Sequence, residues 1–110
     1  MAKILIVYHS RGGNTEKMAH EVKQGAQQAG AQVTRKPVAE AEVDELLEHD
    51  GIIFGSPVYY GYASAELKAF IDKSVKLHGK LTSKVGGAFA SSGVRGGGAE
   101  TTVHSLIDAL

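Results

Sequence analysis

The apolar residues of this 110-residue chain form several short continuous runs. The segments between these runs repeat apolar residues at wider spacing. Such runs are typical of strands that are buried on both faces of a parallel sheet. The sequence predicts four strands, of which the second is a weak candidate and the fourth is poor in large side chains: 4–7, 31–36, 51–56 and 84–90.

The segments between these strands repeat apolar residues at three and four positions, which predicts helices. The first helix is expected over 14–29, with Met18, Val22, Ala26 and Ala29 on its apolar face. A short helix is expected through Val43, Leu46 and Leu47, a third helix over 63–77, and a fourth from about Glu100. Four alternations of strand and helix predict an α/β doubly wound parallel sheet, in which ligands bind beyond the carboxyl ends of the strands.

Composition and charge narrow the range of functions. With 43% apolar and 22% charged residues, positions 1–110 are expected to form a single globular domain. Twelve basic residues balance twelve acidic ones, so the charge favours neither nucleic acid nor a membrane surface as a partner. The chain has no cysteine, which excludes disulfides and thiolate chemistry, and its first apolar run is too short for a signal peptide. A cytoplasmic protein is expected.

The first loop at the expected ligand edge, residues 10–15, suits an anion. Backbone N–H groups at a helix start can bind phosphate oxygens, together with the hydroxyls of Ser10 and Thr15. Gly12 and Gly13 allow the backbone to approach such a ligand closely. The simpler explanation is that Asn14 or Thr15 only caps the helix, and we expect both roles.

The other two loops at this edge suit a flat heterocycle. Three of the four tyrosines lie within residues 56–62, where aromatic rings can stack on a planar ligand: Tyr59, Tyr60 and Tyr62. The loop over 91–98 is rich in glycine, so its N–H groups can lie against ring carbonyls. Each loop alone is ordinary, but three such loops at the same edge of the sheet indicate a binding site.

Together, "YHSRGGNT", "IIFGSPVYYG" and "SSGVRGGGAETT" resemble the three FMN-binding loops of the flavodoxin-like superfamily. The segment "ELKAFIDKS" is also similar to a helix of the WrbA-type NAD(P)H:quinone oxidoreductases. The resemblance implies a three-layer α/β/α fold with strand order 2-1-3-4, FMN as cofactor and NAD(P)H as a transient co-substrate stacked on the flavin. Carried over position by position, it implies this set of FMN-binding residues: Ser10, Arg11, Gly12, Gly13, Asn14, Thr15, Pro57, Val58, Tyr59, Tyr60, Gly61, Ser91, Ser92, Gly93, Val94, Arg95 and Gly96.

The chain also departs from that family. It lacks the long insertion that WrbA-type proteins carry around the second strand, and only His78 stands near the position of their flavin-facing aromatic residue. The fifth strand and last helix of the superfamily are missing from the sequence, which leaves the fourth strand as an open edge. We therefore expect a homo-oligomer that forms through residues 85–90 or the helix over 100–110.

Several alternative functions fit the sequence less well. A response-regulator receiver requires acidic residues after the first and third strands, where this chain has His9, Ser10, Gly55 and Ser56. A small tyrosine phosphatase requires a cysteine, and a serine hydrolase requires a G-x-S-x-G turn. None of the five histidines has metal-ligand spacing, and no side chain is a candidate catalytic acid or base.

Three functions remain open within the resemblance. The first is an FMN-dependent NAD(P)H:quinone oxidoreductase, which acts on a small-molecule quinone. The second is a flavodoxin that carries single electrons to a redox partner protein, and the third is a truncated, non-redox interaction module. Neutral charge and aromatic residues in one loop only indicate an open flavin face, which favours the oxidoreductase.

Overall fold

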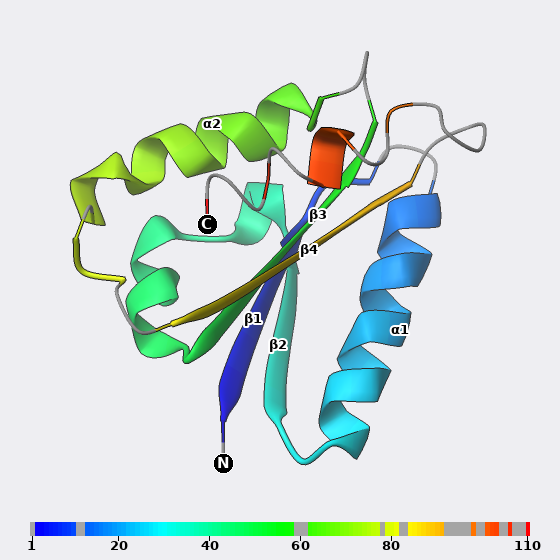
Figure 1. Ribbon diagram of the computed structural model, residues 1–110, viewed down its shortest axis with the longest axis vertical. Helices are drawn as coiled ribbons and strands as arrows, with labels where there is room; N and C mark the ends of the chain where they lie inside the picture. Colours follow the sequence, from blue (N-terminus) through cyan, green and yellow to red (C-terminus); the bar gives the residue numbers. More distant parts are fainter. Residues whose placement is uncertain are drawn as a thin grey trace.

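A parallel sheet of four strands forms the centre of the protein. The computed structural model describes residues 2–10, 13–58, 62–77, 79–81, 84–91, 98, 101–103, 106 and 110. The order of the strands is β2-β1-β3-β4, and each neighbouring pair is parallel (Figure 1). This confirms the predicted strand order, with these bounds: β1 (Lys3–Tyr8), β2 (Gln32–Pro37), β3 (Gly51–Pro57) and β4 (Val85–Ser91).

The two central strands are the most apolar. In β1, Leu5, Ile6 and Val7 are completely buried, because successive side chains point to opposite faces and both faces are covered. The weaker run of β2 lies at one edge and pairs with β1 from Gln32 to Pro37. The glycine-rich β4 lies at the other edge of the described sheet.

Helices cover both faces of the sheet, as expected for a three-layer α/β/α arrangement. The long helix α1 (Asn14–Gln28) lies on one face, and α2 (Ala65–Lys73) lies on the other (Figure 1). Three short 3₁₀ helices complete the described elements: η1 (Val38–Glu40), η2 (Val43–Glu48) and η3 (Ser74–Leu77). Two separate apolar clusters result, one around Ile6 and Ala19 beneath α1 and one around Leu5 and Leu67 beneath α2.

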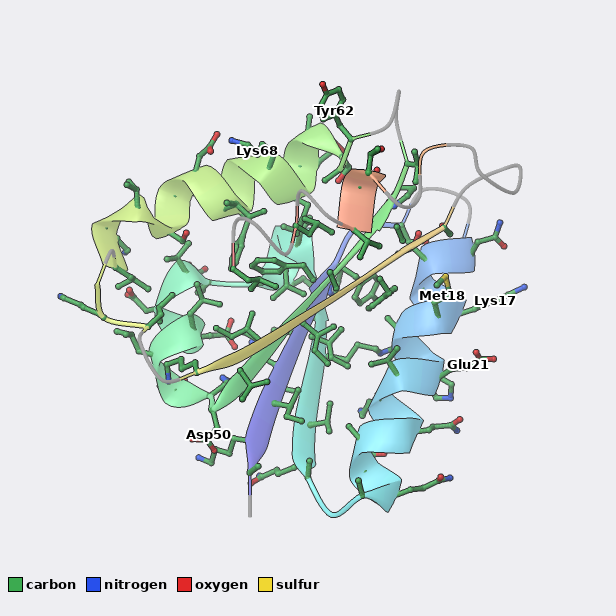
Figure 2. All side chains as sticks on the ribbon, in the orientation of Figure 1. Lys17, Met18, Glu21, Asp50, Tyr62 and Lys68 are labelled. Atoms are coloured by element: carbon green, nitrogen blue, oxygen red, sulfur yellow. The ribbon has the colours of Figure 1, made fainter. Side chains whose placement is uncertain are left out.

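Helix α1 follows its predicted range closely but ends one residue early. Ala19 is fully buried, while Lys17 and Glu21 point away from the sheet (Figure 2). Ala29 does not belong to the core-facing side, because the helix has ended and Ala29 is exposed. Gly30 follows with φ +96°, a left-handed conformation that glycine adopts without strain and that terminates the helix.

The third predicted helix is shorter than its apolar period suggests. Regular α-helix covers only α2, and η3 continues it in the tighter 3₁₀ form. Leu67 and Phe70 are buried beneath it, and the rings of Phe70 and Phe54 meet edge to face with centroids 6.2 Å apart. Val75 was expected on the apolar face but is 73% exposed.

Two other predicted helices differ in extent from the prediction. The segment through Val43 and Leu46 is the 3₁₀ helix η2, and it buries those two residues while Leu47 stays exposed. Of the fourth helix, the structure describes residues 101–103 and 106 as helical. Leu106 is 1% exposed and joins the apolar cluster beneath α2.

Candidate functional site

The candidate site lies where β1, β3 and β4 end, at the upper edge of the sheet in Figure 1. Parallel strands bring their carboxyl ends to the same edge, so the three loops that follow them meet there. Of the predicted FMN-binding residues, the structure describes seven: Ser10, Gly13, Asn14, Thr15, Pro57, Val58 and Ser91. The other ten lie outside the described residues: Arg11, Gly12, Tyr59, Tyr60, Gly61, Ser92, Gly93, Val94, Arg95 and Gly96.

The start of α1 is capped by a residue that precedes the helix by four positions. The Ser10 hydroxyl oxygen accepts hydrogen bonds from the backbone N–H groups of Gly13, at 3.1 Å, and Glu16, at 3.2 Å. Gly13 is the N-cap residue and has φ +91°, so a side chain at this position would be strained. The expectation that Asn14 or Thr15 caps the helix was therefore wrong: Asn14 is exposed on the first turn, and Thr15 has another partner.

This cap prepares the helix start for an anion. A hydroxyl that accepts two N–H bonds keeps its own hydrogen free to donate. The dipole of α1 places partial positive charge at the same end. Ser10 therefore presents a donor at a helix N-terminus, which is the chemistry that phosphate binding requires.

Ser91 joins the ends of the three strands. Its hydroxyl lies 2.9 Å from the hydroxyl of Thr15, and its carbonyl oxygen accepts a hydrogen bond of 3.0 Å from the backbone N–H of Val58. Thr15 ends the predicted loop over 10–15 and lies in the first turn of α1, Val58 follows β3, and Ser91 ends β4. The structure thus brings together one residue from each of the three loops that the sequence singled out.

Two buried serines, one in β3 and one at the N-cap of α2, flank the loop after β3. Ser56 and Ser64 are completely buried, and the Ser64 backbone N–H donates to the Ser56 hydroxyl oxygen at 2.8 Å. Sequence reasoning missed this contact, although a serine before Ala-Glu-Leu is a signal for a helix start. Tyr62, one of the three clustered tyrosines, is 69% exposed and its side chain projects outward (Figure 2).

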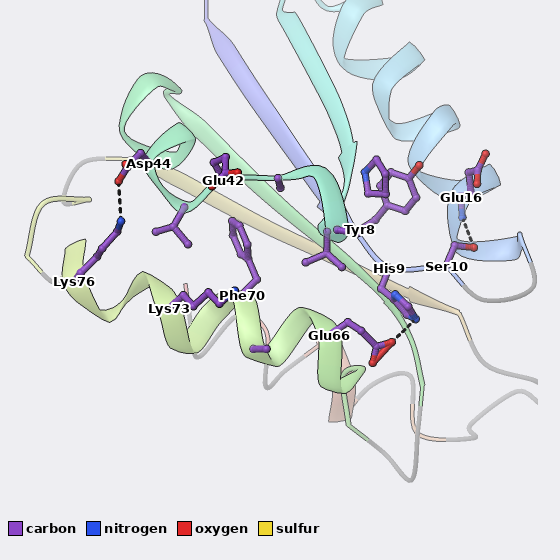
Figure 3. A pocket seen from close by; sticks show the side chains of 16 residues that line it. Tyr8, His9, Ser10, Glu16, Glu42, Asp44, Glu66, Phe70, Lys73 and Lys76 are labelled. Carbon is purple, nitrogen blue, oxygen red and sulfur yellow. Dashed lines mark hydrogen bonds and ion pairs between the residues drawn. The ribbon is translucent and has the colours of Figure 1, made fainter.

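A cleft of about 870 Å³ borders the candidate site on the α2 face. It runs from His9 and Ser10 between α2 and the segment that contains η1 and η2 (Figure 3). Nε2 of His9 lies 2.8 Å from a carboxylate oxygen of Glu66 at one end, and Lys76 lies 3.2 Å from Asp44 at the other. No sequence motif indicated this cleft, because its walls come from segments that are distant in the sequence.

The phenol of Tyr8, the last residue of β1, lies beside Arg35. Burial raises the pKa of the Tyr8 phenol, and the Arg35 guanidinium, 5.7 Å from the ring centroid, opposes that shift. The phenol therefore stays neutral at physiological pH.

Among the described residues, no group of three or more His, Cys, Asp or Glu side chains is placed to hold a metal ion. None of the described helices is long and apolar enough to cross a membrane.

Comparisons with known proteins agree with this architecture. Residues 5–107 match the family described as "Flavodoxin domain". A curated relative from Sinorhizobium fredii (strain NBRC 101917 / NGR234), named NAD(P)H dehydrogenase (quinone), is 40% identical over 132 aligned residues, which cover 100% of this chain and 66% of the relative. The chain thus spans slightly less than two thirds of that relative's length.

Solved structures show the same fold. A flavodoxin described as a WrbA-like protein from Agrobacterium tumefaciens has a TM-score of 0.82 and 32% identity, with 99% of this chain and 71% of that chain covered. A short-chain flavodoxin associated with a bacterial microcompartment has a TM-score of 0.85 and 26% identity, with 99% and 74% covered.

Proposed function

Because this chain belongs to the flavodoxin domain family, we propose that it binds FMN and acts as an NAD(P)H:quinone oxidoreductase. The observation that carries the proposal is the junction at Ser91, which is hydrogen-bonded both to Thr15 and to Val58. The name of the Sinorhizobium fredii relative supports the reaction. The similarity to a WrbA-like structure supports the same group of enzymes.

The described residues fit the phosphate of FMN. In its contacts with described residues the Ser10 hydroxyl only accepts, so its O–H can donate beside the positive end of α1, and Gly13 leaves the approach open, since an added Cβ would meet nothing within 4 Å. We propose that the FMN phosphate is held by residues 10–15. Residues 57–61 would contact the isoalloxazine ring, and residues 91–96 would line its pyrimidine side.

In this proposal the protein mainly binds and orients. When bound, FMN supplies the acceptance and release of hydride or electrons. The hydroxyl of Ser10 and the start of α1 anchor the phosphate end of the cofactor, and the bonds around Ser91 keep the flanking loops at a fixed spacing. Alignment of the substrate against the cofactor then accounts for much of the rate acceleration, and we assign no catalytic acid or base.

Two measurements test the proposal. FMN titrated into the apoprotein should be quenched in fluorescence and should give a yellow complex. The loaded protein should then consume NADH or NADPH with a benzoquinone faster than the same concentration of free FMN does. A protein that leaves FMN fluorescence unchanged contradicts the whole proposal, whereas FMN binding without quinone reduction favours a flavodoxin that serves a redox partner protein.

We also propose two properties that accompany this activity. The NAD(P)H co-substrate supports a cytoplasmic location. The outer position of β4 in the described sheet, with Val85 73% exposed, supports a homo-oligomer that forms along this strand. Sedimentation at micromolar concentration tests the second property, and a monomer there would contradict it.

A further inference from the structure

The cleft on the α2 face is larger than a phosphate group requires. It has a volume of about 870 Å³ and opens next to Ser10, the residue proposed to hold the FMN phosphate (Figure 3). Pockets of about 300–1,000 Å³ bind drug-sized ligands. The cleft therefore has room for a ligand group that extends beyond the phosphate end of FMN.

The two long walls of the cleft are apolar. One wall is the segment after β2, where Val38 and Ala41 pack against the core cluster beneath α2. The opposite wall is α2, which contributes the exposed Ala69 and the buried Phe70. The edge-to-face contact with Phe54 holds the ring of Phe70 in place. Small and flat apolar side chains on both sides of a cleft favour a planar ring system as the ligand.

A polar contact lies at each end of the cleft. At one end, Nε2 of His9 lies 2.8 Å from Glu66, and the backbone N–H of His9 donates to the carbonyl of Gly55 at 3.1 Å. At the other end, Lys76 lies 3.2 Å from Asp44. These contacts hold α2 against the end of β1 and η3 against η2. The space between the walls is therefore formed before any ligand binds, which lowers the cost of binding.

The charges along the cleft favour a neutral ligand group with hydroxyls. Four acidic side chains line it against two lysines: Glu16, Glu42, Asp44 and Glu66 against Lys73 and Lys76. This excess of carboxylates disfavours an additional phosphate deep in the cleft, whereas carboxylates accept hydrogen bonds from the hydroxyls of a ribose. The positive end of α1 lies beside Ser10, so a fitting ligand carries its phosphates there and a neutral nucleoside farther in.

We propose that the cleft binds the adenosine part of FAD, so that the protein accepts FAD as well as FMN. FAD is FMN extended through its phosphate by AMP, so a flavin anchored at Ser10 would carry this extension at the mouth of the cleft. The adenine ring would lie between Ala41 and Ala69. The half-exposed carboxylate of Glu66 would accept a hydrogen bond from a ribose hydroxyl. The inference rests on the proposed function, because Ser10 must hold the phosphate that the two flavins share.

A comparison of ligands in the wild-type protein provides the first test. Equilibrium dialysis should show that FAD binds about 10-fold more tightly than FMN, because the adenosine part adds contacts in a preformed cleft. Free adenosine should weaken the binding of FAD but not that of FMN. FAD that binds no more tightly than FMN would overturn the proposal.

A filled cleft provides the second test. Ala69→Trp places a large ring between the walls and should lower the FAD affinity about 10-fold, to that of FMN, while FMN binding stays unchanged. Lys68→Trp is the matched control and should keep the preference for FAD, because its side chain is 64% exposed on the same helix. Ala41→Leu fills the cleft from the opposite wall and replaces Ala69→Trp if that variant does not fold. An undiminished preference for FAD in the variant with the filled cleft would contradict the proposed position of the adenine.

A readout without flavin separates this inference from the proposed function. Adenosine titrated into the apoprotein should shift the amide NMR signals of Ala41 and Ala69 and leave that of Ala26, on α1, unchanged. Absence of these shifts would overturn the nucleoside site even if FMN binds. If the wild type binds neither flavin, the proposed function fails. Shifts at both positions together with equal affinities for FMN and FAD would overturn the proposal in favour of the adenosine part of NAD(P)H.

Discussion

The hydroxyl of Thr15, in the first turn of α1, lies 2.9 Å from the hydroxyl of Ser91, the last residue of β4. These residues are 76 positions apart in the sequence, and Thr15 is only 2% exposed. The contact fixes the start of α1 against the outer strand of the described sheet. It therefore couples the proposed phosphate loop to the loop proposed to line the flavin's pyrimidine side.

Removal of the Thr15 hydroxyl should destabilise the protein and also weaken FMN binding. Thr15→Val keeps the shape of the side chain but leaves the Ser91 hydroxyl without this partner, which costs about 1–2 kcal/mol for a partly buried hydrogen bond. Urea unfolding of the apoprotein measures the first effect, and FMN titration measures the second.

A double-mutant cycle distinguishes this contact from a general loss of packing. Ser91→Ala alone and Thr15→Val alone should each be destabilising, and the double variant should lose less than the sum, because both changes break the same bond. Strict additivity in the urea data would show that the two hydroxyls do not interact in solution.

The ring of Phe89 occupies the space in which a side chain at Gly55 would lie. A Cβ at Gly55 would stand 2.1 Å from the Cζ atom of Phe89, well inside van der Waals contact. Gly55→Ala should therefore lower the free energy of unfolding by about 1–3 kcal/mol, because the partly buried ring must move aside. Thermal unfolding followed by circular dichroism measures this loss.

Gly51, at the other end of the same buried strand, provides a matched control. A Cβ there would lie 3.4 Å from Cγ1 of Ile4, which is ordinary contact, so Gly51→Ala should change stability by less than about 1 kcal/mol. Combining Gly55→Ala with Phe89→Ala removes the ring and should destabilise less than the sum of the two changes. Equal effects of Gly55→Ala and Gly51→Ala would refute the proposed clash.

The sequence was sufficient to predict the sheet, because the two central strands, β1 and β3, leave continuous apolar runs that alternate with segments of helical period. It was less informative for the helices. The apolar period of 63–77 continues through Val75, yet regular helix ends at Lys73. Hydrophobic spacing does not distinguish an α-helix from a 3₁₀ helix in short segments, and the same ambiguity affects η2.

For the candidate site, the sequence indicated the three loops but not the bonds between them. That Ser10 rather than Asn14 or Thr15 caps α1 depends on the left-handed conformation of Gly13, which lets the chain turn back on the helix start. The pairing of Thr15 with Ser91 depends on how α1 packs against the sheet. Such contacts join distant parts of the chain, and a single sequence carries no local signal for them.

The pair formed by Lys36 and Glu45 should make stability depend on pH. Nζ of Lys36 lies 2.7 Å from a carboxylate oxygen of Glu45, and this hydrogen bond lowers the pKa of Glu45 below its ordinary value of 4.5. A carboxylate with a lowered pKa in the folded state stabilises the fold above its unfolded pKa. That stabilisation is lost as the pH falls from about 4.5 through the lowered folded pKa.

Unfolding midpoints in urea between pH 6 and pH 3 check this dependence. Glu45→Gln removes the titrating group, so its midpoint should fall less steeply with pH than that of the wild type. Asp72→Asn is the control, because the Lys68–Asp72 pair is exposed on α2 and contributes little. Parallel profiles for the wild type and Glu45→Gln would mean that the contact with Lys36 does not shift this carboxyl group.

A variant of Ser10 can distinguish binding of the FMN phosphate from binding of the flavin ring. Riboflavin has the same ring system as FMN but no phosphate, so a residue that binds only the phosphate should affect FMN alone. Ser10→Ala removes a donor to a charged group, which is worth about 1.5–3 kcal/mol, or roughly 10- to 100-fold in the dissociation constant for FMN. It also removes the cap on the N–H groups of Gly13 and Glu16, so some loss of helix stability is expected. Fluorescence titration with both ligands resolves the two effects: an unchanged riboflavin affinity with weaker FMN binding assigns Ser10 to the phosphate, whereas an equal loss for both ligands means that the variant has disturbed the loop as a whole.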